Sequence, residues 1–171
     1  SKQFLQFAKI NGTDLNTSID TVQKAMSAFS LSADDTGAVL DTLNKVGQDT
    51  GISMEVLEQN LVTNATALQG MGLNIASSAR LLGQLEKSGV DVQTVMMGMK
   101  KVQANAMSEG ISMQEAFQKA ISSTTGAIDV FGTKAGPQLY QSFLNGSISA
   151  DMFTDSNASL SDSMGSVEDT F

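Results

Sequence analysis

The sequence predicts an all-α fold, an irregular multi-helix bundle of about seven to nine short amphipathic helices joined by tight turns centred on glycine. Three observations carry this prediction: a composition rich in helix formers, apolar residues at helical spacing, and glycines at the breaks between them. The 171 residues include one Pro, no Trp and one Tyr, whereas strands are usually rich in aromatic and β-branched residues. Helices are therefore expected along almost the whole chain.

Each expected helix carries one apolar stripe. The first consists of residues at steps of three and four, which places them on one helix face: Leu15, Ile19, Val22, Met26 and Phe29. Further stripes begin near residues 39, 54, 75, 92 and 113. Because each helix has one face to bury, the helices are expected to pack on one another.

The breaks between these stripes share a pattern of a glycine, an apolar residue and a side chain that accepts hydrogen bonds. It occurs four times, at Gly51 and Ser53, Gly72 and Asn74, Gly89 and Asp91, and Gly110 and Ser112. The glycine is expected to close one helix in the left-handed conformation, and the accepting side chain to cap the next. Ser112 and Glu115 fit a capping box. The spacing of the glycines leaves a two-helix repeat open as a less favoured alternative.

The last third of the chain has a looser pattern. Gly132 is expected to end a short helix, and Pro137 to take the first position of a helix covering residues 138–144. We expect a single helical domain over residues 1–154. Residues 155–171 are rich in Ser and Asp, which predicts a mobile tail or the start of the next helix of a longer parent protein.

Composition excludes several classes of protein. The chain lacks Cys and His, which removes thiol nucleophiles, histidine bases and Cys/His metal sites, so no metal and no cofactor is expected. The net charge of −8 disfavours binding to nucleic acid. No apolar stretch is long enough to span a bilayer, which predicts a soluble segment.

Two pairs of carboxylates were candidates for acid chemistry, and neither pattern favours it. Asp34 and Asp35 fall in the expected first turn of a helix, where negative charge complements the helix dipole. Glu55 and Glu58 are three residues apart, and we expect them on a solvated face. We therefore predict no catalytic residue and no enzyme.

Methionine is frequent in this chain, with ten residues. Most are expected in the core, since their spacing follows the apolar stripes. Met97 departs from the stripe of its helix, and we interpret it as a possible contact surface for another protein.

Residues 50–102 resemble the N-terminal helical region of phage tail tape measure proteins, and the likeness is strongest in three segments of the chain. They are the entry at Thr50 and Gly51, the run LLGQLEKSGVD over 81–91, and the run AIDVFGTKAGPQLYQSFLNG over 127–146. The resemblance covers about 100 of the 171 residues. Each motif alone is a cap or a turn, so the match is specific only as a set. It departs from the family after Gly72, where Asn-Ile-Ala stands in place of the acidic residues common in relatives.

The resemblance implies a structural virion protein that sets tail length and takes part in tail assembly and DNA ejection. It implies other tape measure copies, tail tube proteins and tail assembly chaperones as partners. It also implies a place in the lumen of the virion tail tube, and in the host bacterial cytoplasm during assembly. Two other readings stay open, a membrane-active or pore-forming helical domain and a helical adaptor module.

Overall fold

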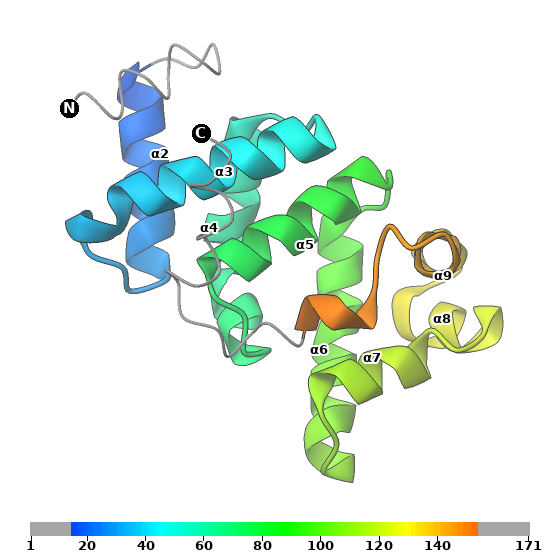
Figure 1. The fold of residues 1–171 in the computed structure, drawn as a ribbon. Helices are drawn as coiled ribbons and strands as arrows, with labels where there is room; N and C mark the ends of the chain where they lie inside the picture. The colour runs from blue at the N-terminus through cyan, green and yellow to red at the C-terminus, as the bar shows by residue number, and fades with distance from the viewer. Residues whose placement is uncertain (1–14, 154–171) are drawn as a thin grey trace. The chain divides into compact units, whose positions relative to one another are not determined.

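The computed structural model describes residues 15–153, and its elements are helical from end to end of that range (Figure 1). It contains eight α-helices and two short 3-10 helices, and the described residues include no strand. The described chain forms two compact units, residues 15–83 and residues 84–153, and each is described by itself.

The first unit contains three complete helices, the 3-10 turn η1 and the start of a fourth helix. Their bounds are α2 (Leu15–Ala28), η1 (Ala33–Asp35), α3 (Thr36–Thr50), α4 (Met54–Gly70) and α5 (Ile75–Lys87), of which residues 75–83 belong to this unit. α4 packs against both α2 and α3. The ends of α2 and α4 are joined by a hydrogen bond in which Gln69 Nε2 donates to the Ala28 carbonyl at 2.8 Å. The core of the unit is aliphatic and includes Val22, Leu43, Leu57, Leu61, Leu68 and Leu82.

A glycine allows α5 to lie close to α3 in this unit. A Cβ on Gly83 would lie 2.7 Å from Val46 Cγ1 and 3.1 Å from Thr50 Cγ2. Both distances are shorter than van der Waals contact, so a side chain at this position would separate the two helices.

α2 ends without a glycine. Ser30 has a φ of 60°, the only positive φ of a non-glycine residue among those the structure describes. The Leu31 amide donates to the Met26 carbonyl at 2.8 Å and the Ser30 amide to Ser27 at 3.0 Å, which closes the helix. A serine thus holds a conformation that glycine adopts at lower cost.

The second unit begins with the end of α5 and is built around α6. Its further elements are α6 (Val92–Glu109), α7 (Met113–Ala120), α8 (Thr124–Phe131), α9 (Ala135–Leu144) and η2 (Ala150–Phe153). α6 contacts α7 and α8, α8 packs on α9, and η2 packs on α7. Phe117 is fully buried, with its ring centroid 5.1 Å from that of Phe153 and 6.5 Å from that of Phe143. These aromatic contacts join α7, α9 and η2 in one core.

Two glycines bring helices together in the second unit. A Cβ on Gly98 would lie 2.6 Å from Phe131 Cε1, and one on Gly136 would lie 2.7 Å from the Ala127 carbonyl carbon. The first glycine seats the Phe131 ring on α6, and the second lets the backbones of α8 and α9 approach.

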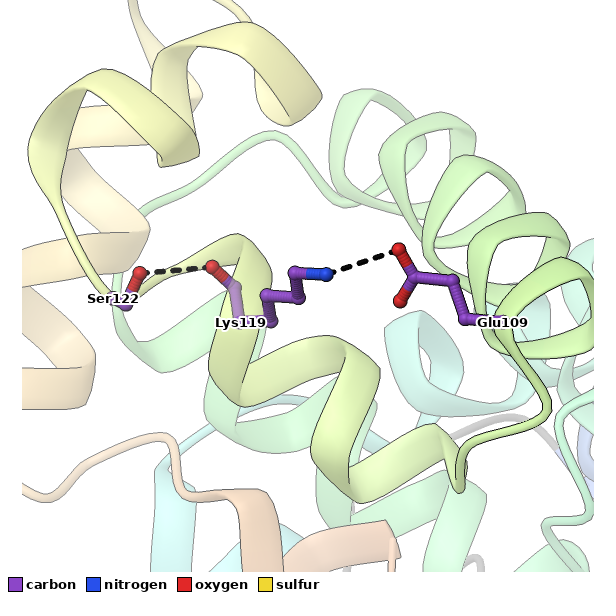
Figure 2. Close-up of polar contacts among 3 residues, drawn as sticks. All are labelled: Glu109, Lys119 and Ser122. Atoms are coloured by element: carbon purple, nitrogen blue, oxygen red, sulfur yellow. Dashed lines mark hydrogen bonds and ion pairs between the residues drawn. The ribbon is translucent and has the colours of Figure 1, made fainter.

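An ion pair joins α6 to α7, and a hydrogen bond closes the end of α7 (Figure 2). Lys119 Nζ lies 3.0 Å from Glu109 Oε1, and Ser122 Oγ donates to the Lys119 carbonyl at 2.9 Å. Both charged side chains are largely exposed, so this ion pair adds little to stability.

The predicted all-α multi-helix fold is confirmed, and the eight α-helices of the described range agree with the expected number. In that range no helix is long and apolar enough to cross a membrane. The prediction of one domain over residues 1–154 stays a prediction beside the two units. The predicted tail over residues 155–171 lies outside the described residues.

Candidate functional site

The sequence predicts glycine-centred turns between helices, which we call corners, and the structure shows how each corner is built. The four glycines of this pattern all have positive φ, with values of 74°, 88°, 78° and 68° at Gly51, Gly72, Gly89 and Gly110. After each of them an accepting side chain receives an amide of the next helix. These bonds run to Ser53 from Val56 at 3.2 Å, to Asn74 from Ser77 at 2.9 Å, to Asp91 from Thr94 at 3.1 Å and to Ser112 from Glu115 at 3.0 Å. The corners therefore satisfy amides that the helix itself leaves unpaired.

Asp91 is the charged residue among these four caps. The Thr94 hydroxyl and the Thr94 amide both donate to its carboxylate, and they lower the pKa of Asp91 below the ordinary value of 3.8, with a smaller contribution from Lys134. The carboxylate is exposed and serves to start α6. Its chemistry is that of a helix cap.

The reciprocal capping box lies at another corner than expected. At Ser112 the hydroxyl accepts from the Glu115 amide, but among residues 15–153 the Ser112 amide donates no hydrogen bond to the Glu115 carboxylate. Ser32 has both halves, since its hydroxyl accepts from Asp34 and its amide donates to Asp35 Oδ2 at 3.2 Å. Asp34 and Asp35 lie in the first turn of η1, the 3-10 helix that leads directly into α3.

Gly132 and Pro137 flank the start of α9. Gly132 ends α8 with a φ of 95°. The expected helix over residues 138–144 begins earlier, at Ala135, so Pro137 is its third residue rather than its first. A proline is tolerated there because the amides of the first turn have no partner within the helix.

These corner residues do not converge on one site. Gly51, Ser53, Gly72 and Asn74 belong to the first unit. The remaining corners lie in the second unit, at separate helix ends. Their arrangement shapes the chain and brings no set of reactive groups together.

Glu58 is buried, which corrects the expectation of a solvated face for Glu55 and Glu58. Only 1% of Glu58 is exposed, while Glu55 is exposed as expected. The reason is visible in the spacing, because Glu58 falls four residues after Met54 and three before Leu61, on the buried stripe of α4. The spacing alone therefore predicts burial of Glu58, whereas the charge of its side chain favoured the prediction of a solvated face.

The environment of Glu58 favours the protonated acid. Burial, with a smaller contribution from the negative charge of Glu55, raises its pKa from 4.5 to about 8. Its Oε1 has no hydrogen-bond partner among the described residues, and the same holds for the buried hydroxyls of Thr42 and Ser78. Polar atoms of this kind destabilise a core unless they are paired.

A raised pKa alone does not make Glu58 a catalytic acid. General acid catalysis requires contact with a substrate, and this carboxyl is closed off from solvent. The nearest charge that affects it, Glu55, lies on the same helix and points to the exposed side. Within residues 15–153 there is also no group of three acidic side chains that could hold a metal ion.

Met97 lies on the outer face of α6, and 63% of it is exposed. Met107 on the same helix is 78% exposed, whereas Met96 and Met99 are buried as the stripe predicts. Lys100 and Lys101 lie between the two exposed methionines and are exposed themselves. This face of α6 combines two large exposed apolar side chains with two positive charges in an acidic protein.

Comparison with known proteins gave one result. The family model described as phage-related minor tail protein matches residues 1–171, the full length of the chain. No curated protein and no solved structure matched.

Proposed function

The chain belongs to the phage-related minor tail protein family, and on this premise we propose that it is part of a tail tape measure protein. Membership makes it a structural, virion-associated tail protein. The proposal adds that the parent protein sets the length of the tail and takes part in tail assembly and DNA ejection. The observation that carries it is the family match over all 171 residues.

The all-α fold supports the proposal because an α-helix rises about 1.5 Å per residue, so a helical protein converts residue number into distance. The described segment itself turns back at its glycine corners. We therefore assign it the role of a folded region attached to the tape, and the measuring length to other parts of the parent protein.

The proposed location is the lumen of the tail tube, after assembly in the host bacterial cytoplasm. There the protein would contact other tape measure copies, tube subunits and tail assembly chaperones. The net charge of −8 suits a lumen through which DNA passes, because an acidic surface does not hold nucleic acid back.

A structural role fits the chemistry better than a catalytic one. The chain has no Cys or His, and Glu58, the one strongly shifted carboxyl among residues 15–153, is inaccessible. A membrane-active domain is the alternative to which amphipathic helices such as α7 could contribute. The balance of charge disfavours it, since ten basic residues stand against eighteen acidic ones. Leakage of a dye from anionic liposomes separates the two, and we expect none.

The test is an early stop codon in the gene of the phage that encodes this chain, with and without the wild-type protein supplied in trans. We expect electron micrographs to show tailless particles or tails of undefined length, and normal tails on complementation. Tails of normal and uniform length without the protein would refute the tape measure role.

A further inference from the structure

The outward face of α6 forms a heptad-like seam. Met97, Lys100, Ala104 and Met107 are separated by three, four and three residues, the spacing that lines one side of a coiled-coil helix. All four are exposed. Lys101 lies beside this line, four residues after Met97 and three before Ala104, and we call these five residues the α6 seam.

The opposite face of α6 already has its partners. Val95, Met99 and Val102 are buried, and Gly98 lies against Phe131 of α8. The α6 seam therefore combines two exposed methionines, Ala104 and two lysines on a helix whose opposite face serves the core. Methionine is frequent at surfaces that bind other helices, because its flexible side chain adapts to the partner.

Positive charge on the seam is uncompensated. Neither Lys100 nor Lys101 forms an ion pair with a described residue. The one acidic residue of α6, Glu109, is bound to Lys119 of α7. The seam thus has two positive charges and no negative one, although the chain as a whole is strongly acidic.

This charge pattern selects the partner. Two α6 seams packed together would place Lys100 and Lys101 of one copy near those of the other, which is unfavourable. A helix with acidic residues beside its apolar stripe would pair with both lysines. We infer that the α6 seam binds an acidic amphipathic helix of another protein. This inference does not depend on the tape measure role.

The first experiment uses two synthetic helical peptides of about three heptads with the same apolar stripe. One carries Glu beside the stripe and the other carries Lys. Each is titrated into the 15N-labelled chain at low salt, and amide shifts are recorded by NMR. We expect the Glu peptide to bind roughly tenfold more tightly or better, with shifts at the α6 seam.

Charge reversal gives the sharper readout. The double variant Lys100→Glu, Lys101→Glu is expected to prefer the Lys peptide, and Met97→Asp to weaken binding of either peptide by at least about tenfold. The matched control, Lys24→Glu with Lys87→Glu, makes the same charge change at exposed sites on α2 and α5 and should keep the original preference. All these positions are exposed, so the variants are expected to fold.

Three results would overturn the inference. They are equal affinity for the two peptides, shifts that lie elsewhere than the α6 seam, and a preference that the Lys100→Glu, Lys101→Glu variant leaves unchanged. Dimerisation of the free chain that Met97→Asp abolishes, seen by sedimentation velocity, would also contradict it, because a second copy would then be the occupant.

Discussion

Gly98 of α6 lies against the ring of Phe131 at the end of α8, so closely that a Cβ on Gly98 would lie 2.6 Å from Phe131 Cε1. The same Cβ would lie 3.0 Å from the Val130 carbonyl oxygen. The packing of α8 on α6 therefore depends on the absence of one side chain. Phe131 is buried, so it has little room to move aside.

Gly98→Ala is expected to destabilise the chain by about 1–2 kcal/mol, because overpacking outweighs the gain in helix propensity. Urea unfolding followed by circular dichroism measures the change. Ala104→Gly on the exposed side of α6 calibrates the propensity contribution alone. In a Phe131→Leu background the Gly98→Ala loss should shrink, and an undiminished loss there would contradict the assigned contact.

Glu58 makes stability depend on pH. Its pKa rises from 4.5 in the unfolded chain to about 8 in the folded one, so the folded state binds the extra proton. The stability that this proton adds to the folded state, relative to the charged carboxylate, is fully present below about pH 4.5. It is lost as the pH rises through about 8, so the free energy of unfolding falls by roughly 3 kcal/mol between pH 5 and pH 8.

Glu58→Gln should remove most of this dependence and stabilise the protein at pH 8 while changing little near pH 4.5. Urea unfolding at several pH values provides the measurement. Glu55→Gln is the control, because it removes the smaller cause of the shift and should leave most of the slope. A wild-type stability that is flat from pH 5 to pH 8 would show that Glu58 is not buried.

Ser30→Gly is expected to stabilise the first unit by about 1 kcal/mol, since the serine has a φ of 60° that glycine adopts freely. Thermal unfolding measures this gain. Ser27→Gly, in the last turn of α2, should have the opposite effect, because glycine has a lower helix propensity than serine. A loss of stability in Ser30→Gly would mean that the serine side chain contributes more than its backbone costs.

Gly110→Ala tests a corner between two helices. Its φ is 68° and the space around it is open, so the cost is one of backbone conformation, about 1 kcal/mol. Gly110→Asn should cost less, because Asn tolerates the left-handed region. Equal losses from the two variants in denaturant unfolding would argue for a steric cause instead.

Much of the fold follows from local patterns, as two corners illustrate. Gly51 and Ser53, like Gly110 and Ser112, combine a left-handed glycine with a cap, and both features depend on neighbouring residues only. Ser30 adopts the left-handed conformation without being a glycine, so its residue type did not predict that conformation. Local pattern is enough only where the residue type matches the conformation.

One missed feature depends on a contact between distant residues, and the other on a charge that conflicted with its local pattern. The fit of Gly98 to Phe131 joins residues on two helices, and nothing in either local sequence specifies the other. Glu58 lay on a readable stripe, but its charge favoured a solvated position. At Glu58 the preference of a charged residue for solvent conflicts with the apolar stripe, and the tertiary packing of α4 buries the side chain.

Tail length offers the most direct test of the proposed tape measure role. A helical insert of about 100 residues, placed in frame after residue 153 in the phage gene, would add roughly 150 Å if the parent protein is a helical ruler. The account predicts that electron micrographs show tails longer by about that amount and as uniform as those of the parent phage. Viable phage whose tails keep their original length would contradict it.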